Sequence, residues 1–359
     1  MATFRYYAHT LPGFGSIAQQ EIASKLSAKS TGIRTVGNQN DVVLFEYGGD
    51  PQRLLEMRST EDVFFLVQHL RKVPSDRRGL AYLRKGIRSA RYFDVGLRIH
   101  KRLCNVNTKR QTTFRVISRR RGHHAYRRID AQRAIEKGVL QRYNYSWRLV
   151  PEGEMIEIWV NLLGTEAIVG LRLSDATMRH RHYKTKHLPA SLRPSAAFAL
   201  AFLSDPEPGD VFLDPMCGAG TILIERALAG RYRLLIGADT DPVAIAAARR
   251  NIGPKYKPLG IGQWDAAHSA LKAGTIDKIV TNLPFGRQIG SHAENVVLYG
   301  EFFTEAQRVL KTGGRMVLLS SERRLIQENL ACYPEFDLQE RYKVSILGTR
   351  ALIYAIDRR

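Results

Sequence analysis

The stretch that decides the fold is Leu213–Thr221, which reads LDPMCGAGT. It joins a short apolar run, VFLDP, to a helical pattern that continues through ILIERALAG, so it is a strand-to-helix loop of the kind at which a doubly wound sheet binds its ligand. Gly218 and Gly220 let the backbone approach a ligand closely, and the helix that follows offers free N–H groups. A dinucleotide fingerprint needs a third glycine at position 223, where this chain has Leu223. The loop therefore predicts a ligand other than NAD.

The pattern that surrounds this loop is typical of an α/β domain. From about residue 193 onward, apolar runs (VFLDP, RLLIGAD, IDKIV, RMVLLSS) alternate with helical patterns (ILIERALAG, PVAIAAARRN, YGEFFTEAQRVL), which predicts a parallel sheet covered on both faces. The last two runs, YKVSIL and ALIYAI, are separated only by Gly348, Thr349 and Arg350, so they predict an antiparallel hairpin. An open parallel sheet that ends in a hairpin resembles the class I methyltransferase fold, which implies a mostly parallel, seven-stranded, Rossmann-like sheet.

Length and composition narrow the class of protein further. A chain of 359 residues can bury two or three cores. The sequence has no apolar run of about 18 residues, and its start, MATFRYYAHT, lacks a signal-peptide core, so we expect a cytoplasmic protein. Cys104, Cys217 and Cys332 lie far apart without CxxC spacing, which disfavours a zinc site and a disulfide framework.

The net charge of +21 is concentrated in the first half of the chain. Residues 1–187 contain 34 Lys/Arg against 16 Asp/Glu, a net charge of +18, whereas residues 188–359 contain 21 against 18, a net charge of +3. A basic surface of this size attracts polyanions and makes their binding salt-dependent. The asymmetry predicts a nucleic-acid partner for the first half.

The first half reads as α+β. Residues 1–70 contain a strand, a Pro-Gly turn and an amphipathic helix in YYAHTLPGFGSIAQQEIASKL, followed by a second strand, DVVLFEYG. Residues 71–175 alternate basic helical stretches with the strands TFRVIS, MIEIWVNLL and EAIVGLRL. Residues 176–192 become polar and end in KHLPASLRP, which predicts a linker.

A carboxylate follows the second apolar run of the α/β half. Asp239, in GADTD, comes 25 residues after Asp214, roughly where an acidic side chain meets the ribose hydroxyls of a nucleotide ligand. Asp241 precedes Pro242 and a helical pattern, so we expect it to cap that helix.

The hexapeptide Thr281–Gly286, TNLPFG, follows the apolar run IDKIV and resembles the amino-methyltransferase motif [N/D/S]-[P/L/I]-P-[Y/F/W], which implies a methyl transfer to an exocyclic amine. An exocyclic amine conjugated to a base is a poor nucleophile, so its lone pair must be turned out of conjugation before it attacks an electrophilic methyl group. The Asn282 carboxamide oxygen and the Leu283 carbonyl can each accept one amine hydrogen, Pro284 has no competing N–H, and Phe285 offers a face for a flipped base. Catalysis would then be orientation plus electrostatics.

Methylation of pyrimidine C5 is disfavoured because it uses an attacking cysteine near this strand, and the sequence has no cysteine near residue 282. Cys217 lies in the first loop, where we interpret its side chain as packing.

The two loops resemble known motifs. LDPMCGAGT resembles the S-adenosylmethionine motif D-P-x-C-G-x-G-T, and TNLPF resembles the amino-methyltransferase motif [N/D/S]-[P/L/I]-P-[Y/F/W]. The resemblance implies S-adenosyl-L-methionine as the cofactor, with Asp214 facing its sulfonium and amino end and Asp265, in GQWDAA, holding the adenine amino group. The implied cofactor-binding set is Asp214, Cys217, Gly218, Gly220, Thr221, Asp239, Asp265 and Asn282.

The whole chain resembles the THUMP-domain tRNA methyltransferases. This resemblance implies a ferredoxin-like domain at residues 1–70, a THUMP RNA-binding domain at 71–175, a linker at 176–192 and the methyltransferase domain at 193–359. TNLPFGRQIGSHAENVVLY is close to the branch that makes N2-methylguanosine at the sixth nucleotide of the tRNA acceptor stem. The branch that modifies the tenth nucleotide usually has D-P-P-Y, from which Asn-Leu-Pro-Phe departs.

By the same resemblance, the THUMP domain would grip the tRNA acceptor end, and we expect the protein to act as a monomer. The candidate phosphate-binding residues are Arg119, Arg120, Arg121, Arg127 and Arg128, since arginine binds phosphate bidentately. Arg287 would contact the target nucleotide or a neighbouring phosphate. Neither a metal nor a proton transfer is assigned to the histidines of the basic stretches, which are His123, His124, His180, His182 and His187.

Three alternatives stay open at this point: N2-methylation at the tenth tRNA nucleotide, adenine-N6 methylation of another RNA or of DNA, and a catalytically silent RNA-binding protein.

Overall fold

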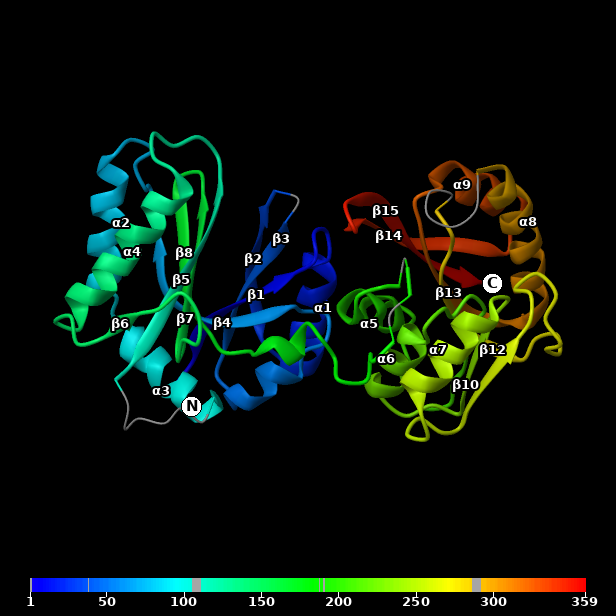
Figure 1. Ribbon diagram of the computed structural model, residues 1–359. Helices are drawn as coiled ribbons and strands as arrows, with labels where there is room; N and C mark the ends of the chain where they lie inside the picture. Colours follow the sequence, from blue (N-terminus) through cyan, green and yellow to red (C-terminus); the bar gives the residue numbers. More distant parts are fainter. Residues whose placement is uncertain (1, 38, 105–110, 187, 190, 286–291) are drawn as a thin grey trace. The chain divides into compact units, whose positions relative to one another are not determined.

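The computed structural model describes residues 2–37, 39–104, 111–186, 188–189, 191–285 and 292–359. The chain divides into two compact units, Met1–Met178 and Arg179–Arg359, which are coloured from blue to green and from green to red in Figure 1. Within the described ranges, no helix combines the length and the hydropathy needed to cross a bilayer.

The first unit is built on an eight-stranded mixed sheet with the strand order β2-β3-β1-β4-β8-β7-β5-β6. Its strands are β1 (Phe4–Thr10), β2 (Lys29–Val36), β3 (Asn40–Tyr47), β4 (Asp62–Leu70), β5 (Thr113–Arg121), β6 (Arg148–Leu149), β7 (Ile156–Leu163) and β8 (Glu166–Arg172). Its helices are α1 (Gly15–Leu26), α2 (Arg78–Arg88), α3 (Phe93–Cys104) and α4 (Arg128–Arg142), with short 3-10 helices η1 (Pro51–Glu56) and η2 (Ala176–Met178).

The strands expected at TFRVIS, MIEIWVNLL and EAIVGLRL are confirmed as β5, β7 and β8. The strand β2 was not predicted, because KSTGIRTV has few apolar residues and lies at the sheet edge with mostly exposed or half-buried side chains. The strands β4 and β8 pair with each other, so one sheet runs through both predicted parts of the first half. The domain boundary at residue 70 stays a prediction.

The second unit is built on a seven-stranded sheet with the order β11-β10-β9-β12-β13-β15-β14. Its strands are β9 (Val211–Asp214), β10 (Leu234–Asp239), β11 (Leu259–Gln263), β12 (Ile276–Asn282), β13 (Leu310–Ser320), β14 (Phe336–Ile346) and β15 (Thr349–Arg358). Its helices are α5 (Pro194–Leu203), α6 (Thr221–Ala229), α7 (Pro242–Ile252), α8 (His292–Val309) and α9 (Arg323–Cys332). The first five strands of that order run parallel and the last two pair antiparallel, as expected for a class I methyltransferase fold.

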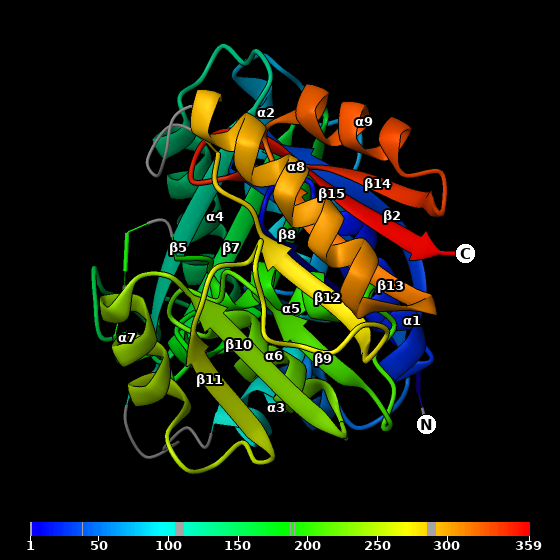
Figure 2. The ribbon, with the colours of Figure 1, turned by 90° about the vertical axis from the view of Figure 1, so that its right-hand side faces the viewer.

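Both faces of this sheet are covered. Helices α8 and α9 cover one face, where Figure 2 shows them in front of the strands, and their buried side chains, including Phe303 and Ile326, share a core with Ile279 and Leu318. Helix α5 packs against α6, β12 and β13, while α6 and α7 pack against β10. Polar loops are thereby left to emerge only at the two ends of the strands.

The predicted terminal hairpin is confirmed, but its turn differs from the expected one. Ile346 pairs with Thr349, so the turn is Leu347–Gly348, and Thr349 and Arg350 belong to β15. Both turn residues have positive φ, 49° and 82°. That backbone geometry closes a two-residue turn whose twist matches the flanking strands.

The amide side chain of Asn251 in α7 helps to attach the segment before α5 to the rest of the second unit, beside the hydrogen bond from the Tyr183 hydroxyl to Glu225. Asn251 Oδ1 accepts hydrogen bonds from the backbone N–H groups of Thr185 and Lys186 at 3.1 and 2.9 Å. Its Nδ2 donates to the carbonyl oxygens of Lys186 and Ala219, each at 3.0 Å. The chain from Thr185 is therefore held against the loop that precedes α6. The linker at 176–192 and the start of the catalytic domain at residue 193 stay predictions.

Candidate active site

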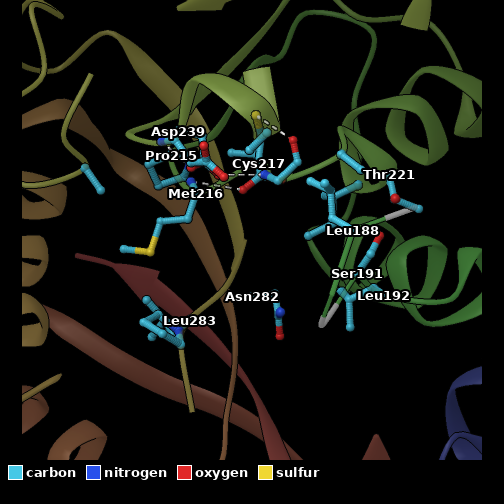
Figure 3. A pocket seen from close by; sticks show the side chains of 18 of the residues that line it. Leu188, Ser191, Leu192, Pro215, Met216, Cys217, Thr221, Asp239, Asn282 and Leu283 are labelled. Atoms are coloured by element: carbon cyan, nitrogen blue, oxygen red, sulfur yellow. Dashed lines mark hydrogen bonds between the residues drawn. The ribbon is translucent and has the colours of Figure 1, made fainter. Parts of the chain in front are cut away.

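A cavity of about 600 Å³ opens at the carboxyl ends of β9, β10 and β12. Figure 3 shows Asp239, Met216 and Cys217 along one side, Leu188, Ser191 and Leu192 along another, and Asn282 with Leu283 along a third. The cavity joins the predicted cofactor loop, the predicted ribose carboxylate and the predicted catalytic motif in one place.

The loop after β9 is shaped by its glycines and pinned by hydrogen bonds. Gly218 and Gly220 have φ of 51° and 76°, and a Cβ atom on Gly220 would lie 3.0 Å from Ile252 Cδ1. The Cys217 N–H donates to the Ala238 carbonyl at 2.7 Å, which ties the loop to β10. Thr221 begins α6 and lines the cavity, so the free N–H groups of that helix start at its wall.

Cys217 lines the same cavity, but the residue is only 6% exposed. Burial, with the neighbouring Asp214 and Asp239 carboxyls, raises the pKa of this thiol well above its ordinary value. The group therefore stays a neutral thiol, which fits the packing role expected for it.

Asp239 is oriented by two backbone groups. Its Oδ2 accepts from the Gly218 N–H at 2.8 Å and its Oδ1 from the Asp241 N–H at 3.0 Å. Each carboxylate oxygen keeps a further lone pair for a ligand hydroxyl. The capping role expected of Asp241 is confirmed, because its side chain accepts from the Val243 N–H at 2.8 Å with Pro242 in the first turn.

Asp265 lies on the rim of the cavity, with its side chain 51% exposed. Its Oδ1 accepts from the Ala267 N–H at 2.9 Å, which leaves the other oxygen directed to solvent and 3.9 Å from His268 Nδ1. Its place in the third loop is as expected.

Asp214, at the end of β9, is fully buried. Its Oδ1 accepts a long hydrogen bond of 3.4 Å from the Met216 N–H, whereas Oδ2 has no hydrogen-bond partner among the described residues. Burial raises the pKa of this carboxyl to about 8, with the nearby Thr281 hydroxyl and Met216 N–H opposing the shift and Asp239 adding to it. The site thus holds a carboxyl that gains by meeting a cation.

Asn282 is the last residue of β12, and it lines the cavity. Its side-chain Oδ1 is buried without a hydrogen-bond partner in the described part of the chain. The next residue, Leu283, is fully buried, and its N–H donates to the Leu319 carbonyl at 3.0 Å. The strand therefore delivers an amide acceptor to the cavity and anchors the residue that follows.

The turn after Leu283 is held by α8. The Pro284 carbonyl accepts from Asn295 Nδ2 at 3.0 Å and from the Tyr299 hydroxyl at 2.8 Å. That hydroxyl also contacts Ser320 Oγ at 2.8 Å. Asn295, Tyr299 and Ser320 were not predicted, because nothing in an amphipathic helix marks which polar residue faces a loop. Phe285 lines the cavity, and Arg287 lies outside the described residues.

Two further segments of the wall were missed by the sequence reasoning. Leu188, Pro189, Ser191 and Leu192 come from the segment before α5, and Ile346, Leu347 and Thr349 come from the β14–β15 hairpin. Only their positions in the folded chain bring them to the cavity. The prolines of LPASLRP were the one available signal for an irregular segment at this point.

The described lining residues fit S-adenosylmethionine. The unpartnered Oδ2 of Asp214 suits its cationic end, and the carboxylates of Asp239 and Asp265 suit hydroxyl and amino groups. No group of three His, Cys, Asp or Glu with metal-binding geometry occurs within the described ranges.

The candidate RNA-binding arginines lie in the first unit, and each has an intramolecular partner. Arg120, Arg121 and Arg128 donate to the carbonyl oxygens of Tyr126, Thr35 and Ser118. Arg119 bonds to Asn40 and stacks 4.7 Å from the Trp159 ring centroid, and Arg127 Nε lies 3.6 Å from Asp130 Oδ2. Part of their hydrogen-bonding capacity is therefore used within the fold.

A second hollow, an open groove of about 990 Å³, lies in the first unit between α2 and α4. Its basic lining residues are Arg77, Arg84, Arg120, Arg127, Arg133 and Lys137. The side chains of Arg84 and Lys137 make no hydrogen bond or ion pair within the described ranges. This groove offers free cationic groups at a spacing that the sequence alone did not reveal.

Comparison with known proteins finds similarity to methyltransferases in both sequence and fold. Residues 181–351 match a family described as the RMKL-like methyltransferase domain. The crystal structure of TrmN from Thermus thermophilus has a TM-score of 0.79 at 22% identity and covers 100% of both chains, so the two share a fold.

Two curated relatives extend the comparison. Human tRNA (guanine(6)-N(2))-methyltransferase THUMP3 is 32% identical over 261 residues, which are 68% of this chain and 51% of the human protein. The chain thus spans about half the length of that relative. The tRNA (guanine(6)-N2)-methyltransferase of Methanocaldococcus jannaschii is 24% identical over 406 residues, covering 97% of this chain and 98% of the archaeal one.

Replacing Tyr299 by Phe tests the contact between α8 and the Pro284 carbonyl. Loss of one of two donors should loosen the turn after Asn282, and we expect kcat to fall by about fivefold, since a neutral hydrogen bond contributes about 1 kcal/mol. The cofactor Kd should stay within twofold. The matched control is Tyr333→Phe, which removes a hydroxyl bonded to Thr304 instead; an equal loss in both variants would rule out a specific role.

The raised pKa of Asp214 predicts pH-dependent cofactor binding. A cation needs the ionised carboxyl, so affinity should rise by up to tenfold per pH unit toward about pH 8 and level off above it. The stability of the unliganded protein should change with pH in the opposite direction. The folded carboxyl keeps a proton that the unfolded chain releases, so the free energy of unfolding should fall as the pH rises from about 4 to about 8.

Calorimetry with S-adenosylmethionine, which carries the sulfonium charge, in buffers of different ionisation enthalpy would measure the affinity and the proton released. Asp214→Asn should flatten the affinity profile. A wild-type profile that is already flat would contradict the assigned protonation of Asp214.

Proposed function

We propose that this chain belongs to the THUMP-type tRNA guanine(6)-N2 methyltransferase family, with a class I S-adenosylmethionine-dependent methyltransferase domain. In this proposal it methylates the exocyclic N2 amine of a guanosine in tRNA at position 6 of the acceptor stem. The observation that carries the proposal is the buried Asn282 Oδ1, which has no partner in the described part of the chain and faces the cavity beside the cofactor loop. A buried amide oxygen left unpaired costs free energy, so it is expected where a ligand donates to it.

The residues of the motif would act by orientation. Asn282 Oδ1 and the Leu283 carbonyl would each accept one hydrogen of the target amine, which turns its lone pair out of the plane of the base. The hydrogen bond from Leu283 N–H to Leu319 and the two donors on Pro284 keep these acceptors in place before the substrate arrives. S-adenosylmethionine, when bound, supplies an electrophilic methyl group on a sulfonium.

The proton of the methylated amine needs no dedicated base. An alkylated exocyclic amine that still carries its proton is strongly acidic and loses it to water. The described lining residues include no histidine and no lysine, and the carboxylates among them lie in the loops after β9, β10 and β11, which we assign to the cofactor.

RNA would be held by the basic first unit. The groove between α2 and α4 brings six basic side chains together, and Arg84 and Lys137 have their charged groups free of other bonds within the described ranges. We propose that this groove binds backbone phosphates and that Arg119, Arg120, Arg121, Arg127 and Arg128 contribute with their remaining donors. The acceptor end as the part of the tRNA bound, the monomeric state and the cytoplasmic location stay predictions.

The function is tested by incubating the protein with labelled S-adenosylmethionine and unmodified tRNA transcripts, followed by nucleoside mass spectrometry. N2-methylguanosine that disappears when the sixth nucleotide is changed from guanosine to adenosine would support both base and position. The same nucleoside surviving that change would point to another position, and N6-methyladenosine would replace the proposal with adenine methylation. Absence of cofactor binding would identify a silent RNA-binding protein.

Asn282→Ala should lower kcat by about 10²–10³-fold, the range seen when one preorganised transition-state hydrogen bond is removed. The RNA Kd should change little, because the phosphate contacts lie elsewhere. Asn282→Asp keeps an acceptor oxygen and should retain more activity than the alanine variant. Wild-type turnover in Asn282→Ala would show that the carboxamide has no catalytic role.

The double variant Arg84→Ala/Lys137→Ala should weaken tRNA binding and reduce the magnitude of its salt slope by about 1.5, since each phosphate contact contributes roughly 0.7–0.9. The control is Lys85→Ala/Lys101→Ala, which removes the same charge from exposed positions of α2 and α3 outside the groove. Equal slopes for the two double variants would mean that only net charge matters.

A further inference from the structure

Leu347 occupies a position for which leucine is poorly suited on two counts. It is the first residue of the two-residue turn between β14 and β15 and has a φ of 49°, a conformation that favours asparagine, aspartate or glycine. Its side chain is also 64% exposed, so it gains little from burial. A residue in an unfavourable backbone conformation that is not compensated by burial of its side chain is often found at a functional site.

The surroundings of Leu347 indicate what that function is. The turn lies on the rim of the cavity, and Ile346 and Leu347 line this cavity together with Phe285 and Leu298. The turn is carried by a long hairpin in which β15 pairs with β13 as far as Leu352, so the tip of the hairpin projects past the end of β13 to the rim.

The lining of the cavity has a charged part and an uncharged part. The loops after β9, β10 and β11 present the carboxylates of Asp214, Asp239 and Asp265, which suit the charged and hydroxyl groups of the cofactor. The described residues that line it from β12 onward are uncharged, and they combine apolar side chains with the amide of Asn282 and the hydroxyl of Thr349. Apolar walls around one amide acceptor match a nucleobase, which has apolar faces and a polar edge with an exocyclic amine.

We propose that Leu347 is a base-contacting residue: its side chain packs on the face of the flipped target base while Asn282 accepts from the amine at the base edge. This inference rests on the proposed function, because it assigns a further residue to the same site. The unfavourable turn conformation then places an apolar group at the rim, where a small polar turn residue could not reach the base.

The test uses a substitution that improves the turn and removes the contact. Leu347→Asn supplies the residue that a turn of this kind prefers, so Tm should stay the same or rise, and the cofactor Kd should remain within twofold of wild type. The kcat/KM for tRNA transcripts should fall by about tenfold, toward the lower end of the losses seen when an aromatic side chain that stacks on one base is removed. Leu347→Met keeps the apolar volume and should restore most of the activity.

Leu338→Asn is the matched control, because Leu338 lies in β14 of the same hairpin, is 39% exposed and does not line the cavity. The inference is overturned if Leu347→Asn retains kcat/KM within twofold of wild type, if Leu338→Asn is equally impaired, or if the loss comes with a lower Tm and weaker cofactor binding, which would indicate a structural role. A wild-type protein that methylates no RNA overturns the proposed function itself, whereas an active wild type with an equally active Leu347→Asn overturns only the role of Leu347.

Discussion

The candidate active site depends on one topological constraint: the parallel sheet changes its direction of winding between β9 and β12. From β9 the chain moves outward through β10 and β11, then returns to place β12 on the other side of β9. The loops that leave the carboxyl ends of these neighbouring strands must therefore diverge, and the space between them becomes a ligand crevice. Leu213 pairs with Ile279, so Asp214 and Asn282 stand at this edge about two residues, or roughly 7 Å, apart along the strand direction.

The constraint explains why polar groups can be buried at this edge without partners. Asp214 Oδ2 and Asn282 Oδ1 are both buried and unpaired within the described residues. In a protein that bound nothing there, each would cost free energy with no compensation. The surrounding hydrogen bonds hold the backbone of both loops, which leaves the two side-chain oxygens for a ligand. The fold thus leaves two buried hydrogen-bond acceptors that a bound ligand can satisfy.

Some residues of the candidate site could be predicted from the sequence, because a local pattern of apolar residues indicates where they lie in the fold. Asp214, Asp239 and Asn282 each end an apolar run, and the ends of parallel strands meet at one edge, so their proximity could be predicted. Leu188 and Leu347 reach the same cavity from irregular segments, and no periodicity in the sequence indicates where such segments lie.

The arginines show a similar limit of prediction from the sequence. Counting charges identified the basic half correctly, but it could not show that Arg120, Arg121 and Arg128 donate to backbone carbonyls. Arg84 and Lys137 are 53 residues apart in the sequence. They line the same groove because α2 packs against α4. Composition reports how many charges are present, whereas tertiary packing decides which of them are free.

The Asn251 side chain also determines how small an autonomous catalytic domain can be. Its amide accepts from Thr185 and Lys186 and donates to Lys186 and Ala219, so one side chain serves both the segment before α5 and the cofactor loop. A fragment that began at Arg193 would contain every strand of the second sheet, yet it would leave most of that amide unsatisfied and remove Leu188 and Leu192 from the cavity wall. The smallest piece of this chain that could be excised, fused to another protein or circularly permuted with its pocket intact therefore begins upstream of Thr185, well before the first helix of the sheet domain.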